Sequence, residues 1–191
     1  TVVGEGHAVH EGIVRVLEST GADLIIMGSQ GRRGLEKLVL GSVTQRVLGV
    51  SCLRDEGANL LHWLAHHRAA GITDWLLFTN DCADGTDTLL DLLQGAGIVT
   101  HLRSAVPEGK TPQWSALRQA GSHPAMGAAD WVAVIDCDEY LNLRAPLDTV
   151  QDLIAACDAD AIVLPWRLFG HAGHAMRPPV PPTQALSLIH I

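Results

Sequence analysis

The most informative part of the chain reads Trp131-Val132-Ala133-Val134-Ile135-Asp136-Cys137-Asp138-Glu139-Tyr140. Five apolar residues run directly into three carboxylates, which is typical of a buried parallel strand whose carboxyl end opens onto a site. Ligands of open α/β sheets bind beyond the carboxyl ends of the strands, so we expect a binding site here. Asp136 and Asp138 are two positions apart, and an extended backbone would point both side chains the same way.

The two aspartates predict a site for a divalent cation. Two like charges this close resist joint ionisation unless a cation joins them. A hard divalent ion that prefers oxygen ligands is the natural partner, and such an ion usually binds together with a phosphate group. The pattern therefore favours a metal with a phosphorylated substrate.

Other interpretations of the acidic cluster remain open. Carboxylates after a strand can simply cap the next helix or solvate a loop. An aspartyl-phosphate enzyme would use Asp136 as the nucleophile and Asp138 as the acid. A calcium loop needs a glycine at its sixth position, and because Leu141 stands there, that reading fails.

Composition narrows the class of protein. The chain has 191 residues, and 47% of them are hydrophobic, which supports a packed core. The net charge of −8 argues against a nucleic-acid partner. The four cysteines contain no C-x-x-C pair, which predicts reduced thiols in a cytoplasmic protein. We expect no transmembrane segment, because no apolar run approaches about 20 residues. Thr1 in place of a Met indicates a fragment.

Alternating strand and helix patterns predict an α/β fold with a mostly parallel sheet. The expected strands cover residues 23–27, 75–79, 98–102, 131–135 and 161–166. The expected helices cover residues 12–20, 42–48, 60–70, 86–94, 112–120 and 147–157. Four prolines between residues 178 and 182 argue against regular structure from residue 177 onward. The last five residues resemble a translated sequencing adapter, so residues 177–191 are expected to be disordered or artefactual.

A glycine pattern follows the first expected strand. Gly28, Gly31, Gly41 and Ser42 give the spacing G-x2-G-x9-G-S, and glycines let the backbone approach a phosphate at a helix N-terminus. This spacing resembles the ATP-binding signature of the universal stress protein family over residues 1–50. The resemblance implies that these four residues surround nucleotide phosphates. Strands of that domain are missing, so we expect a partial α/β segment that does not bind ATP alone.

Four further motifs follow in order: CLRDEG at 52–57, HWLAHHR at 62–68, FTNDCADGT at 78–86 and DCDEY at 136–140. With WRLFG at 166–170, they resemble family 2-like glycosyltransferases of the bacterial branch that acts on envelope glycans. The resemblance covers residues 51–173. It implies a GT-A fold with a Rossmann-like sheet, a UDP- or GDP-linked sugar donor and a glycan acceptor.

The same resemblance implies roles for the acidic residues. Asp136 and Asp138 would hold Mn²⁺ or Mg²⁺ on the diphosphate, where the metal acts as Lewis acid and template. Asp81 and Asp84 would lie near the base and ribose. A turn and a helix cap are the alternative roles for these two residues, because Asp is favoured in both.

Arg54 and Glu56 would flank the nucleotide base after the first strand of this part, and a solvated helix start is their alternative. His62 and His66 share one helix face, but without the Glu of H-E-x-x-H they are expected on the surface or in a groove rather than on zinc. The catalytic residue is unknown. An inverting transferase needs a carboxylate base, which in this family lies C-terminal to the metal motif.

The two resemblances meet near residue 50 without a flexible linker, and each lacks a piece at the join. We therefore expect a chimera with a partial stress-protein segment at 1–50, a truncated glycosyltransferase domain at 51–176 and a tail at 177–191. The alternative function is a stress-protein-like ATP-binding module without catalysis.

Overall fold

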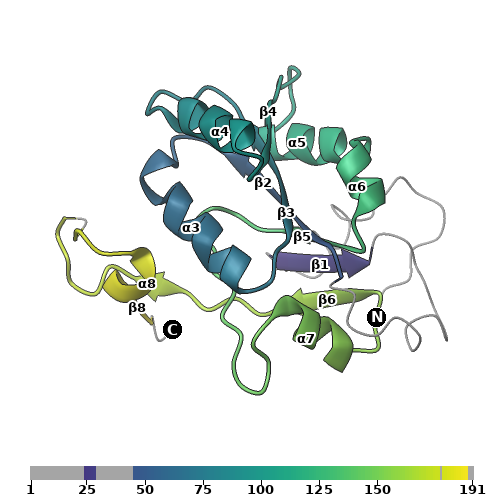
Figure 1. Cartoon of the computed structure of the whole chain (residues 1–191). Helices are drawn as coiled ribbons and strands as arrows, with labels where there is room; N and C mark the ends of the chain where they lie inside the picture. Colours follow the sequence, from purple (N-terminus) through teal and green to yellow (C-terminus); the bar gives the residue numbers. More distant parts are fainter. Residues whose placement is uncertain (1–23, 29–44, 177, 189–191) are drawn as a thin grey trace.

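The structure, a computed structural model, describes residues 24–28, 45–176 and 178–188 (Figure 1). Six strands form one sheet in the order β4-β3-β2-β5-β1-β6. Four neighbouring strands are parallel, and β1 runs antiparallel to both β5 and β6. The expected α/β fold with a mostly parallel sheet is confirmed. The strands are β1 (Leu24–Gly28), β2 (Val47–Leu53), β3 (Asp74–Thr79), β4 (Thr100–Arg103), β5 (Trp131–Val134) and β6 (Ala161–Leu164).

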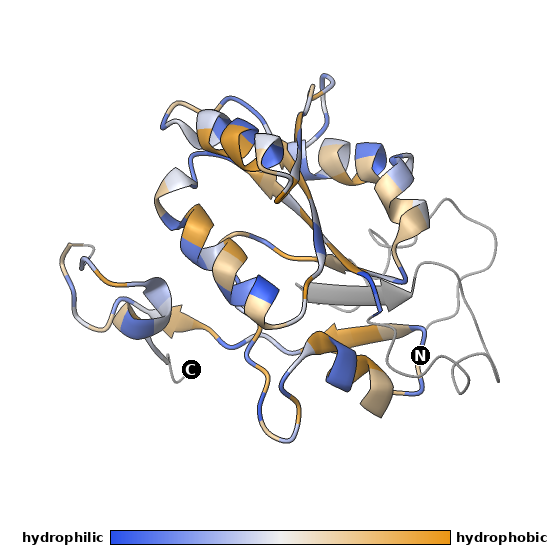
Figure 2. Cartoon of the chain, in the orientation of Figure 1, coloured by the Kyte–Doolittle hydropathy of each residue, from blue (hydrophilic) through white to orange (hydrophobic). Residues whose placement is uncertain are grey.

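Helices cover both faces of the sheet (Figure 1). One face packs against α3, α4 and α7, and the other packs against α5 and α6. The central strands are buried on both faces, which explains their continuous apolar runs (Figure 2). The helices are α3 (Gly57–Ala69), α4 (Thr86–Gly95), α5 (Pro112–Gly121), α6 (Pro124–Ala128), α7 (Val150–Ala156) and α8 (Pro182–Ala185).

Gly49 in β2 makes room for the largest side chain of the neighbouring strand. A Cβ atom at Gly49 would lie 2.3 Å from the indole of Trp75, so no larger residue fits without movement. The Trp75 ring in turn packs against Trp63 of α3 with a centroid distance of 4.6 Å. This contact anchors α3 over the centre of the sheet.

The helix expected over residues 42–48 is wrong where the structure describes it. Residues 45 and 46 are irregular, and Val47–Leu53 form β2. Val47, Leu48 and Val50 are all buried between β3 and β5, so pairing within the sheet overrides the local helical pattern. The boundary expected between residues 50 and 51 therefore falls inside a central strand.

The strand expected at 23–27 is confirmed as β1, but its place in the sheet was not foreseen. It lies between β5 and β6, with Gly28 opposite Trp131. The helix expected over residues 12–20 lies outside the described residues.

The expectation of no regular structure after residue 177 is also wrong. Pro182 opens α8, where a helix tolerates proline because the first N–H has no partner within the helix. β8 (Ser187–Leu188) pairs with β7 (Phe169–Gly170). In the parts of the chain that the structure describes, no helix has the length and apolarity needed to traverse a bilayer.

Candidate active site

Three loops with carboxylates leave the same edge of the sheet. β3, β2 and β5 are adjacent and parallel, so the loops that follow their carboxyl ends must lie together. The loops span residues 54–56, 80–85 and 135–140. Their acidic residues are Asp55, Glu56, Asp81, Asp84, Asp136, Asp138 and Glu139.

The electrostatics of Glu56 show that these loops converge. Burial, followed by the negative charges of Asp138 and Asp84 and then Asp136, raises the pKa of the Glu56 carboxyl. Together with Asp55, which also raises this pKa, the charges come from all three loops, so carboxylates gather at this edge. A cation is favoured at such a place.

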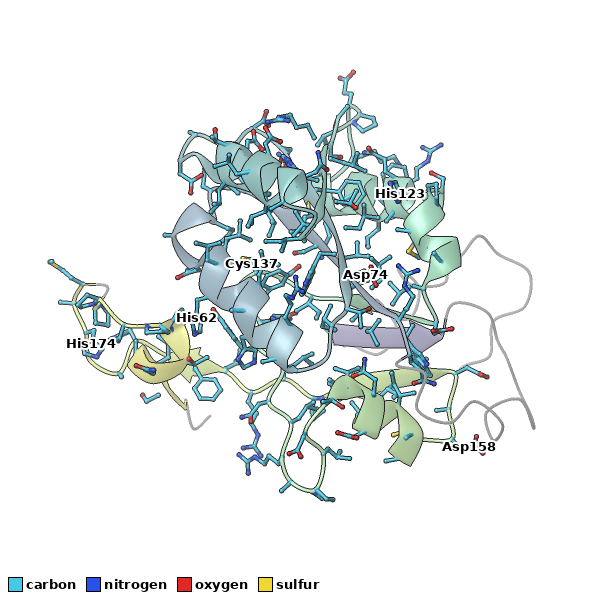
Figure 3. All side chains as sticks on the ribbon, viewed as in Figure 1. His62, Asp74, His123, Cys137, Asp158 and His174 are labelled. Carbon is cyan, nitrogen blue, oxygen red and sulfur yellow. The ribbon has the colours of Figure 1, made fainter. Side chains whose placement is uncertain are left out.

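Asp136 and Asp138 are both exposed, while Cys137, which lies between them, and Glu139, which follows them, are buried. The N–H of Glu139 donates to the carbonyl of Asp136 (3.0 Å), which closes the turn. Gln113 of α5 donates a long hydrogen bond to Asp136 Oδ1 (3.5 Å). Cys137 packs beneath α3 (Figure 3), where burial raises the pKa of its thiol to about 12.

Glu139 is a site residue whose role the sequence did not reveal. Its side chain is 8% exposed and accepts from the backbone N–H of Asp136 (2.9 Å) and from Trp166 Nε1 (2.9 Å). Burial, with a smaller contribution from Asp136 and Asp138, raises the pKa of Glu139 to about 7. This carboxyl braces the acidic turn from inside.

Helix α3 holds the backbone of the acidic loop. Trp63 Nε1 contacts the carbonyl oxygens of Asp136 (3.1 Å) and Glu139 (2.9 Å). His66 Nε2 bonds the carbonyl of Leu141 (2.8 Å). The loop is held by the hydrogen bond that closes its turn, by Glu139 and by α3. The side chains of Asp136 and Asp138 remain exposed.

The histidines of α3 contact the acidic loop. Among the described residues, no group of three or more His, Cys, Asp or Glu side chains is arranged to hold a metal ion. His62 Nδ1 lies 3.1 Å from the hydroxyl of Tyr140. His67 is buried, bonds the Trp63 carbonyl through Nδ1 (2.9 Å) and accepts from the N–H of Leu141 (3.3 Å). Burial lowers the pKa of His67 to about 4. Its place one turn after Trp63 on the helix is the signal that it is a core residue.

The loop after β3 uses its carboxylates internally. Asp84 Oδ2 accepts from the N–H of Gly57 (3.0 Å), and Oδ1 accepts from the N–H of Thr86 (2.9 Å) and from its hydroxyl. Asp55 Oδ1 accepts from the N–H of Ala83 (2.6 Å). The turn and cap interpretation of Asp84 matches these bonds, which tie the starts of α3 and α4 together.

The remaining expected base-side residues lie at the same edge. Arg54 is exposed, with Nε 3.9 Å from Asp55 Oδ2. Asp81 is exposed and adopts a left-handed φ of 50°, a conformation that Asp tolerates better than most residues. Its carboxylate accepts a long hydrogen bond from Asn80 (3.4 Å). Of the expected ATP loop, Gly28 ends β1, and Gly31, Gly41 and Ser42 lie outside the described residues.

The chemistry of the donor set fits a hard divalent cation. Asp136 and Asp138 offer only oxygen ligands and lie exposed at an edge where carboxylates from three loops gather. Two carboxylates leave most of the six or so oxygen positions for water or phosphate. The site therefore suits a cation that arrives with a phosphorylated ligand.

A cavity of about 320 Å³ lies at the opposite edge of the sheet. It is lined by residues around the amino ends of β2, β3 and β4, among them Arg46 and Asp74. These two side chains form an ion pair at 3.0 Å, so they satisfy one another. The acidic edge, and not this cavity, carries the groups suited to chemistry.

Comparison with known proteins divides the chain as the motifs do. Residues 1–51 match the model of the universal stress protein family, and residues 51–184 match the model of glycosyltransferase family 92. The chain belongs to glycosyltransferase family 92. The expected match to a glycosyltransferase family is thus confirmed, but the family is family 92 where a family 2-like one was expected, and the match continues past residue 173.

Curated relatives exist for both parts. A family 92 protein of Ricinus communis is 29% identical over 108 residues, which are 53% of this chain and 18% of that protein. A family 92 protein of Oryza sativa is 28% identical over 106 residues, which are 53% of this chain and 17% of that protein. A universal stress protein of Methanocaldococcus jannaschii is 51% identical over 39 residues, which are 20% of this chain and 24% of that protein. The chain spans a quarter or less of each relative. No solved structure matches it.

Proposed function

We propose that the acidic edge binds a nucleotide-diphosphate sugar, UDP- or GDP-linked, through Mn²⁺ or Mg²⁺ for transfer to a glycan acceptor. The observation that carries this is the convergence of carboxylates from three strand ends, marked by the raised pKa of Glu56, in a chain of glycosyltransferase family 92. Asp136 and Asp138 would hold the cation. When bound, it would neutralise charge that develops on the leaving diphosphate.

The chain's own residues would position the donor. Turn closure, Trp63 and Glu139 hold the acidic loop, so the two aspartates need little reorganisation on binding. Arg54, Glu56 and Asp81 would meet the base and ribose. Asp84 acts through the loop that it braces, because both of its oxygens already accept local hydrogen bonds.

The test is a calorimetric titration of UDP and of GDP with and without Mn²⁺. Metal and nucleotide share ligands in this proposal, so each should raise the affinity of the other. Asp138→Asn removes a charge but keeps the shape, and it should abolish most of that coupling. Equal nucleotide affinity with and without Mn²⁺ in the unmodified chain would remove the metal role and leave Asp136 and Asp138 as an acidic strand end.

The match of residues 1–51 to the universal stress protein family favours a second candidate, an ATP-binding module without catalysis. The described strand of that segment, β1, pairs with β5 and β6 on its two sides. We expect no independent ATP site there. Calorimetry that gave a Kd for ATP tighter than about 10 μM, roughly −7 kcal/mol, would contradict this expectation.

We also infer that the chain is a chimera of two unrelated reading frames that meet near residue 50, through an assembly error or a gene truncation. Genomic DNA across codons 45 to 55 tests this inference directly. An uninterrupted reading frame there in a living organism would show that the join is natural.

A further inference from the structure

The segment after β6 exposes large apolar side chains. Of nine large hydrophobic side chains that are exposed among the described residues, seven lie between residues 163 and 186. Trp166 (56% exposed), Leu168 (42%) and Phe169 (48%) fall within four positions. Scattered exposed apolar residues are normal, but a cluster of this kind usually marks a binding surface.

Trp166 is tied to the candidate active site. Its Nε1 donates to Glu139 Oε1 (2.9 Å), and Glu139 Oε2 accepts from the N–H of Asp136 (2.9 Å). One buried carboxyl therefore joins the indole to the acidic loop. The polar end of the ring is satisfied while much of its apolar area stays in water. The fold thus links an exposed indole ring, through the Glu139 carboxyl, to the backbone of Asp136.

We propose that the exposed face of Trp166 is the platform on which a sugar ring of the acceptor saccharide stacks. A pyranose ring carries C–H bonds on one face and hydroxyl groups around its rim. The negative face of an aromatic ring attracts such polarised C–H bonds, and the contact removes apolar area from water. This inference rests on the proposed function, because it gives Asp136 and Asp138 to the donor.

The order of the strands assigns this platform to the acceptor. The loops proposed for the base and ribose follow β2 and β3, which lie on one side of β5 in the sheet. Trp166 follows β6, which lies on the other side of β5. The acidic loop after β5 stands between the two. A donor and an acceptor that meet at Asp136 and Asp138 would approach from these opposite sides.

The experiment is saturation-transfer NMR on the full chain with UDP and Mn²⁺ present. The probes are the methyl β-glycosides of glucose, galactose and mannose, each used alone. We expect transfer to the ring C–H protons of at least one probe. Trp166→Ala should lower that transfer by about fivefold, and Trp166→Phe, which keeps an aromatic face, should restore part of it.

Trp114→Ala is the matched control. Trp114 is a partly exposed tryptophan on α5, contacted by Lys110 and Arg118, and its loss should leave the transfer unchanged. Equal transfer in Trp166→Ala and the unmodified chain would overturn the platform.

Two further measurements distinguish failure of the platform from failure of the donor site and from self-association. The affinity of the unmodified chain for UDP, measured with and without Mn²⁺, tests the proposed function alone. If Mn²⁺ does not change the UDP affinity but the glycoside signal still depends on Trp166, the donor site fails and the platform does not. Sedimentation velocity tests whether a second copy of the chain covers the surface. A dimer that Trp166→Ala dissociates, together with no glycoside transfer, would overturn the platform in favour of self-association.

Discussion

Two acidic loops leave the same edge of the sheet, but they use their carboxylates in different ways. In the loop after β3, Asp84 accepts hydrogen bonds on both oxygens from Gly57 and Thr86. In the loop after β5, the backbone is instead bonded by Trp63, which donates to two backbone carbonyls, and by the buried Glu139, which accepts from a backbone N–H. Asp136 and Asp138 consequently lie exposed on the outer side of that loop.

The difference shows what makes an aspartate available to a ligand. Buried backbone groups must be satisfied. In the loop after β3 the partners are the carboxylates of Asp84 and of Asp55 from the neighbouring loop, whereas in the loop after β5 they are Glu139 and the α3 side chain Trp63. The loop after β5 has outside support because α3 lies over it. The comparison predicts that removing this support changes the second loop far more than the first.

The largest effect is expected for Trp63→Ala. Trp63 is fully buried, packs on Trp75 and bonds the acidic loop, so truncation should lower the free energy of unfolding by about 3–5 kcal/mol. Urea denaturation followed by circular dichroism measures this loss. Trp114→Ala is the control, since that ring is partly exposed. A loss no larger than that of the control would show that α3 does not support the loop.

The next effect concerns the pH dependence of stability through His67. Burial lowers its pKa from 6.5 to about 4 in the folded chain, so the unfolded chain binds the proton more tightly. The stabilisation is fully present above pH 6.5 and is lost as the pH falls toward 4. The loss should reach about 3 kcal/mol.

Replacement His67→Gln isolates this contribution, because glutamine does not titrate. The difference in unfolding free energy between the variant and the unmodified chain, measured from pH 7.5 to 4.5, should shift in favour of the variant as the pH falls. A difference that stays constant over this range would show that His67 is not buried in its neutral form.

Much of the fold was readable from the sequence because strong local patterns agree with the final structure. The apolar run from Trp131 to Ile135 and the helix that begins after Gly85 are examples. β2 was misassigned because Val47 to Val50 carry no strand signal strong enough to oppose a helix, and only pairing with β3 and β5 decides their state. Long-range pairing of this kind is invisible to local patterns.

The candidate site was readable only in part for the same reason. The spacing of Asp136 and Asp138 predicts that they share a side, and both are exposed. The buried Glu139 accepts from the N–H of Asp136 and from Trp166, and Trp166 is 27 positions away in sequence. The local roles of Asp55 and Asp84 likewise depend on contacts between loops that follow different strands.

The smallest effect is expected for Asp84→Asn. Asparagine keeps one oxygen acceptor, so it can still accept from Thr86 but loses one of the two acceptors for the N–H of Gly57, which also donates to the Thr86 hydroxyl. The loop after β3 should loosen, and affinity for UDP should fall by a few fold, about 1 kcal/mol or less. The ratio of UDP affinities with and without Mn²⁺ should stay unchanged, because Asp84 does not touch the cation in this proposal. Asp138→Asn should do the reverse and remove most of that ratio. If Asp84→Asn also removed the Mn²⁺ dependence of UDP affinity, both loops would bind the cation, and the proposed difference between the two loops would be wrong.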